Sequence, residues 1–179
     1  MRLPSPDAAL ISAFDAMLAI PQRRGVPLPA VLVPFAWLPV LACPLVIASL
    51  PLLGATLVVF VPAWLLFGGW GVMLALRHTR TLRSDAANWT PERIAFRHAE
   101  AMRHRERMAS VRGMLLAFAL MLTFLALAGI ATGEPRLWPL TLTVLAYDSL
   151  AIGTGMMLYA WCTLPASTAR VVASNLSTA

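Results

Sequence analysis

The feature that most constrains this chain is one apolar stretch, residues 28 to 76, which contains no Asp, Glu, Lys or Arg. A single helix crosses about 30 Å of hydrocarbon with roughly 20 residues. The stretch is therefore too long for one crossing and must fold back on itself. Ser49-Leu50-Pro51 is the natural break, because proline interrupts a helix. We predict two spans here, at about 29–49 and about 52–76.

The composition of the whole chain supports a membrane protein. Hydrophobic residues make up 59% and charged residues 12% of the 179 residues, whereas a typical soluble domain has about 45–50% apolar and about 25% charged residues. Two later apolar stretches predict further spans at about 113–132 and about 137–164. The predicted fold is thus an all-α integral membrane protein with four transmembrane helices.

The arginines orient these spans. All 14 basic residues are Arg, and they precede the first span, fill residues 77–112 and follow the fourth span. The two loops on the opposite side hold one, Arg136. The positive-inside rule then places both termini and residues 77–112 in the cytoplasm, and we expect a bacterial-type inner (plasma) membrane. The predicted organisation is an amphipathic cytoplasmic or interfacial segment, a membrane domain and a cytoplasmic tail, at 1–27, 28–164 and 165–179.

The net charge of +6 bears on partners. In a soluble protein such a basic balance would suggest nucleic acid. In a membrane protein the positive charge orients the spans and lets the cytoplasmic face contact anionic lipids. We therefore expect anionic lipids and no nucleic acid among the partners.

The middle segment has the start signals of a helix. Thr90 can cap it, Pro91 suits the first helical position, and Glu92 falls in the first turn. No Pro or Gly follows until Gly113, so we predict a cytoplasmic helical extension that runs unbroken into the third span. Its arginines are expected to dock on a partner or to contact lipid headgroups, and they are Arg93, Arg97, Arg103, Arg105 and Arg107.

The N-terminal segment is also amphipathic. Leu10, Phe14, Met17 and Leu18 recur at helical spacing, with Asp7 near the start. A helix of this length is too short to cross a bilayer. It is expected to lie in the membrane interface or to dock on a partner, and the sequence leaves both open.

Asp148, near the middle of the fourth span, is the sharpest departure from an apolar span. An ionised carboxyl facing lipid at this depth costs several kcal/mol, so it should face protein or water. Three hypotheses remain open: a proton or cation site, a polar anchor for another subunit, or a neutral acid hydrogen-bonded to Thr123 or a backbone carbonyl. Ser149, its neighbour, belongs to the same candidate group.

Small residues and prolines shape the spans. Ser149 with Gly153 and Ala151 with Gly155 are each four residues apart in the fourth span, a spacing that lets helices approach closely. We predict that Ala151, Gly153 and Gly155 pack against another helix. The first span carries a proline every five residues, which predicts a bent or partly irregular helix shielded by protein; these are Pro29, Pro34, Pro39 and Pro44. The alternative is a broken helix whose freed carbonyls coordinate an ion or substrate.

No motif in the chain points to catalysis, a cofactor or a metal. All three histidines lie at or beyond the inner boundary, so no span offers the paired histidines of a bundle haem; they are His78, His98 and His104. There is no phosphate-binding glycine loop, zinc motif or serine nucleophile elbow. Cys43 and Cys162 are predicted to lie at different depths, and we interpret both as small apolar residues.

These features predict a non-catalytic integral membrane subunit, an accessory or scaffold protein of a larger assembly. Other membrane subunits or further copies of the chain would be its partners. The alternative is a small oligomeric transporter or channel that uses Asp148 as a proton or cation site. A membrane enzyme acting on a lipid is a third hypothesis, for which the sequence supplies no catalytic constellation.

Overall fold

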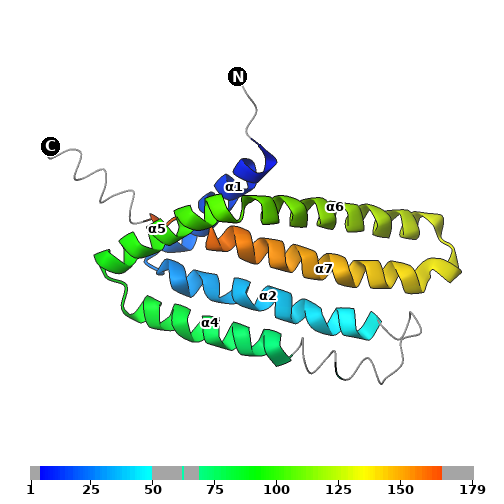
Figure 1. Ribbon diagram of the computed structural model, residues 1–179, viewed down its shortest axis with the longest axis horizontal. Helices are drawn as coiled ribbons and strands as arrows, with labels where there is room; N and C mark the ends of the chain where they lie inside the picture. Colours follow the sequence, from blue (N-terminus) through cyan, green and yellow to red (C-terminus); the bar gives the residue numbers. More distant parts are fainter. Residues whose placement is uncertain (1–4, 50–61, 63–68, 167–179) are drawn as a thin grey trace. The chain divides into compact units, whose positions relative to one another are not determined.

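The computed structural model describes residues 5–49, 62 and 69–166, and every regular element in these ranges is a helix (Figure 1). The chain divides into two compact units. Of the described residues, 5–34, 78–112 and 158–166 form the first, which we call the arginine-rich unit. The other described residues, 35–49, 62, 69–77 and 113–157, form the second, which we call the apolar unit.

Three helical stretches are long and apolar enough to cross a membrane. They are α2 (Leu28–Ser49), α6 (Ala109–Thr132), and the stretch Pro135–Trp161, which joins the 3-10 turn η3 (Pro135–Leu137) to α7 (Trp138–Trp161). They coincide with the first, third and fourth predicted spans, as expected of a multi-pass membrane protein. Most of the second predicted span, 52–76, lies outside the described residues, and its described end opens α4 (Gly69–Ala87).

Within the apolar unit, α2 and α7 approach closely at one glycine. A Cβ atom on Gly153 would lie 3.1 Å from the backbone oxygen of Leu38, which is closer than packed atoms normally come. A Cβ on Gly155 would meet no described atom within 4 Å. Residues two positions apart on a helix lie on nearly opposite faces, so only one of the two glycines faces α2. Ala151 is buried, and Gly129 of α6, not singled out by the sequence, abuts Thr141 of α7.

Alanine substitutions at the two glycines of α7 should therefore differ. Gly153→Ala is expected to lower the free energy of unfolding by about 1 kcal/mol relative to Gly155→Ala, because the new methyl group overpacks against the α2 backbone. Both changes alter helix propensity equally, so the difference isolates packing. Unfolding of the detergent-solubilised protein by SDS titration measures it. Equal stability of the two variants would refute a tight contact at Gly153.

The helices of the arginine-rich unit begin with side-chain caps. In α1 (Pro6–Arg23) the hydroxyl of Ser5 accepts a hydrogen bond from the amide of Ala8 at 3.2 Å. In α5 (Pro91–Arg107) the hydroxyl of Thr90 accepts one from the amide of Arg93 at 3.4 Å. Each helix also has proline in its first turn. The predicted start of the middle helix is confirmed.

The prediction that this helix runs unbroken into the third span is wrong. α5 ends at Arg107, Met108 has φ −98° and ψ 7°, and α6 begins at Ala109. A ψ near 0° lies in the bridge region rather than the helical one. The carbonyl of Arg105, which a continuous helix would pair with the amide of Ala109, accepts from the Arg112 side chain at 3.0 Å instead. A side chain thus caps α5 and turns the chain at Met108.

Candidate functional site

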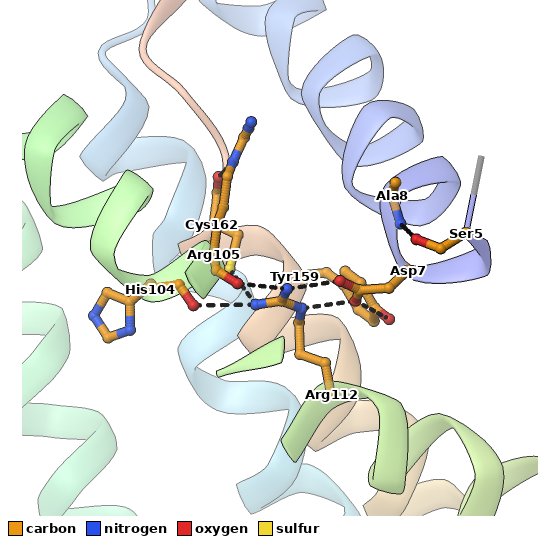
Figure 2. A network of polar contacts seen from close by, with 8 residues as sticks. All are labelled: Ser5, Asp7, Ala8, His104, Arg105, Arg112, Tyr159 and Cys162. Carbon is orange, nitrogen blue, oxygen red and sulfur yellow. Dashed lines mark hydrogen bonds and ion pairs between the residues drawn. The ribbon is translucent and has the colours of Figure 1, made fainter. Parts of the chain in front are cut away.

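The arginine-rich unit contains a buried guanidinium whose five donors are all used. Arg112, in the first turn of α6, is 1% exposed. Its Nη1 donates to the carbonyl of His104 at 3.1 Å, and its Nη2 to that of Arg105 at 3.0 Å. Both carbonyls belong to the last turn of α5. That of His104 also accepts from the amide of Met108 at 3.0 Å, whereas that of Arg105 lies at the helix end, where carbonyls lack helical donors. Figure 2 shows the guanidinium lying between this helix end and Asp7.

Asp7, in the first turn of α1, accepts two further hydrogen bonds from Arg112. Nε and Nη2 of the guanidinium donate to its two carboxylate oxygens at 2.9 and 2.8 Å, the bidentate geometry that makes arginine–carboxylate pairs strong. The hydroxyl of Tyr159 donates to the same carboxylate at 3.0 Å, and the guanidinium lies 5.6 Å from the centre of the Tyr159 ring. The hydrogen bonds from Arg112 hold the pKa of Asp7 below its ordinary value.

A second ion pair joins α1 to α5. Arg105 donates through Nη2 to the Asp15 carboxylate at 2.6 Å and through Nε to the carbonyl of Cys162 at 2.8 Å. The other oxygen of Asp15 accepts from the amide of Leu164 at 3.1 Å. Two turns beyond Asp15 on α1, the side chain of Gln22 accepts from the amide of Ala166 at 2.7 Å. Helix α1 is thus fixed along its whole length to the end of α7 and the residues that follow it.

A third cluster joins α4 to α5. Arg97 is buried, donates to Asp85 of α4, and forms an ion pair with Glu100 at 2.7 Å. Its guanidinium lies 5.6 Å from the centre of the Trp161 ring. Arg97 and Arg105, which the sequence analysis assigns to docking or to lipid headgroups, have their charges paired inside the chain. The remaining three arginines of the predicted set are exposed, and they are Arg93, Arg103 and Arg107.

Cys162 also departs from the sequence interpretation. Its buried sulfur accepts a hydrogen bond from Arg112 Nη1 at 3.1 Å, so it belongs to the polar network rather than acting as an apolar filler. Burial raises the pKa of the Cys162 thiol above its ordinary value. The neutral thiol therefore accepts this bond without adding a second negative charge beside Asp7.

In the apolar unit the structure brings Asp148 and Thr123 together. Asp148 of α7 is 6% exposed, and the hydroxyl of Thr123 on α6 donates to its Oδ2 at 2.8 Å. The other oxygen, Oδ1, is buried without a hydrogen-bond partner in the described part of the chain. Ser149 does not join them, because its hydroxyl donates to the carbonyl of Leu145 at 2.9 Å.

Ser149 instead lines an apolar cavity between the end of α2 and the middle of α7. The cavity has a volume of about 350 Å³, and its described lining is Leu45, Ala48, Ser49, Leu142, Leu145, Ala146 and Ser149. The hydroxyl of Ser49 also bonds to its own helix, at the carbonyl of Val46, 2.6 Å away. The polar groups of this lining are thus satisfied by backbone, and the cavity presents an apolar wall.

The polar side chains described here form hydrogen bonds and ion pairs that hold helices together. The carboxylate of Asp7 accepts from Arg112 and that of Asp15 accepts from Arg105. No group of three His, Cys, Asp or Glu in the described ranges could hold a metal. Sequence reasoning missed Asp7, Asp15 and Tyr159 as members of this site. A signal was present in the spacing, because two acids eight residues apart in the N-terminal segment match two bases seven residues apart in the middle segment. Comparison of the chain with protein-family models, curated proteins and solved structures finds no match.

Proposed function

We propose that this chain is a non-catalytic integral membrane subunit that docks a partner of a larger assembly on its cytoplasmic side. The outward face of α5 carries the proposal. Phe96 is 52% exposed there, and Met102, Arg103 and Arg107 are exposed with it, whereas the inward arginines of the same helix are ion-paired. Aromatic residues, Met and Arg are the residue types enriched at protein interfaces.

The path of the chain through the two units supports the proposed topology of four spans with both termini cytoplasmic. The chain leaves the arginine-rich unit twice, for residues 35–77 and 113–157, and each excursion is long enough for two crossings. Among the described residues, every arginine except Arg77 and Arg136 belongs to the arginine-rich unit. The positive-inside rule places such a unit in the cytoplasm, here that of a bacterial-type inner membrane.

Purification of the tagged full chain in a gentle detergent tests the docking role. We expect foreign subunits in fixed stoichiometry with the wild type. In a variant combining Phe96→Ala, Arg103→Gln and Arg107→Gln, the amount of co-purified foreign subunit should fall at least about tenfold, as expected when interface hot spots are removed. The matched control is Arg80→Gln with Arg83→Gln, two exposed arginines of α4, and it should retain them.

Two outcomes would overturn the docking role. One is retention of the foreign subunits by the α5 variant with its circular dichroism spectrum unchanged. The other is a wild-type protein that purifies as a homo-oligomer with no other chain at fixed stoichiometry.

A homo-oligomer would favour the second proposal, a small transporter or channel that uses Asp148. The specific observation behind it is the carboxyl oxygen Oδ1, which is buried beside Thr123 with no described partner. An acid at such a position in a span is a recurring feature of proton and cation pathways. Proton flux into liposomes reconstituted with the purified chain measures this activity directly.

A further inference from the structure

An amphipathic helix usually turns its apolar face toward the protein and its charged face outward. Helix α1 instead turns its acids toward the protein and an apolar face outward. Both of its acids face the protein, where Asp7 and Asp15 pair with arginines. Phe14 and Leu18 lie on the same inward side, the first stacked on Tyr159 at 5.6 Å and the second buried. The opposite side is exposed and mostly apolar; it carries Ala9, Ala13, Ala16, Met17 and Ile20, with Ser12 at its margin.

These outward residues form one continuous stripe. Their spacing of three, four and seven residues puts them on a single helix face. Met17 is 44% and Ile20 56% exposed, although the sequence spacing groups Met17 with Leu10, Phe14 and Leu18, and the last two of these face inward. Burial of exposed apolar surface is favourable. The stripe therefore requires an apolar contact that the described residues do not supply.

Two observations select a lipid surface as that cover. The stripe ends at Arg23 and Arg24, both exposed, so the charge next to it suits anionic phosphate groups. The apolar helix α2 begins at Leu28, and the residues between, 24 to 27, span at most about 14 Å when extended. If α2 crosses the membrane, the last turn of α1 lies at the level of the lipid headgroups.

We infer that α1 lies on the cytoplasmic leaflet, with its apolar stripe at the boundary of headgroups and acyl chains and with Arg23 and Arg24 on anionic headgroups. This inference rests on the topology given under the proposed function, and it does not depend on the docking role of α5. Amphipathic helices with basic residues bind membrane surfaces in this way. The acids that would be repelled by the same headgroups are turned inward and neutralised by arginine.

Nitroxide accessibility in nanodiscs tests this placement. The full chain would carry one spin label at a time through Ile20→Cys, Ala13→Cys or, as the control, Glu106→Cys on the outward face of α5. Labelled wild type corrects for the native Cys43 and Cys162. In nanodiscs of phosphatidylcholine with phosphatidylglycerol, the labels on α1 should be several-fold more accessible to oxygen than to a water-soluble nickel chelate, and the control should show the opposite order.

The arginines give a second measurement. Raising the phosphatidylglycerol fraction should increase the oxygen preference at Ile20→Cys, and Arg23→Gln with Arg24→Gln should abolish that dependence. Nickel accessibility at Ile20 equal to that of the control would overturn the inference. Low accessibility to both reagents would overturn it in favour of a protein cover, and dipolar broadening between labels would identify that cover as a second copy of the chain.

Discussion

Replacing Arg112 by methionine is expected to lower the free energy of unfolding by about 2–4 kcal/mol. Loss of one partner of a buried ion pair costs about 3–5 kcal/mol, and we expect somewhat less here because the Asp7 side chain is 27% exposed and can recover water. The change also strips donors from the carbonyls of His104 and Arg105 at the end of α5. Thermal unfolding of the detergent-solubilised protein, followed by tryptophan fluorescence, measures the loss.

The control for this prediction is Arg103→Met, which removes an exposed arginine of α5 and should change stability by no more than about 0.5 kcal/mol. Adding Asp7→Asn to each background completes a double-mutant cycle. Asp7→Asn should destabilise the wild type clearly and the Arg112→Met variant hardly at all. Additive effects in that cycle would mean that the two residues do not act as a pair.

At Asp148 we expect leucine and asparagine to give different results. Asp148→Leu removes the acceptor of the Thr123 hydroxyl, and a lost hydrogen bond inside a membrane costs roughly 0.5–2 kcal/mol. Overpacking by the larger buried side chain adds to this, for a total of about 2–3 kcal/mol. Asp148→Asn keeps the size and an oxygen acceptor, so its stability in SDS titration should stay close to that of the wild type.

Function separates the hypotheses for Asp148 further. If Asp148 carries protons or cations, both variants should abolish flux, because asparagine cannot release a proton. If it is a neutral structural acid, the asparagine variant should assemble and function normally. The hypothesis of a polar anchor for another subunit is less well supported by the geometry, because both the residue and its Oδ1 atom are buried inside this chain.

The helices of this protein could be predicted closely because hydropathy and caps act locally. The first span was placed within a residue of α2, since its apolar run begins and ends at polar or turn-forming residues. The start at Thr90 and Pro91 followed from cap chemistry alone. The break at Met108 could not be predicted, because it depends on the Arg112 side chain and its distant partner Asp7 rather than on a local Pro or Gly.

The candidate site was predicted less well, for a related reason. Residue type and depth identified Asp148, and the pairing with Thr123 was one of the hypotheses considered. The docking or headgroup role was given to all five arginines of the segment because it is rich in arginine. That richness does not say which of them faces inward. Arg97 and Arg105 differ from Arg103 because they meet acids contributed by other helices, and sequence spacing within α5 does not contain those partners.

The attachment of α1 has a consequence for the order in which this chain can mature. Asp7, Asp15 and Gln22 bond to Tyr159, Leu164 and Ala166, which are 152, 149 and 144 residues further along the chain. Helix α1 therefore meets these partners only after residues 159–166 have been synthesised. Until then its acids have their arginine partners but lack the bonds from Tyr159 and Leu164. A chain truncated before Tyr159 would therefore hold α1 less firmly than the full chain does, and this difference distinguishes the two.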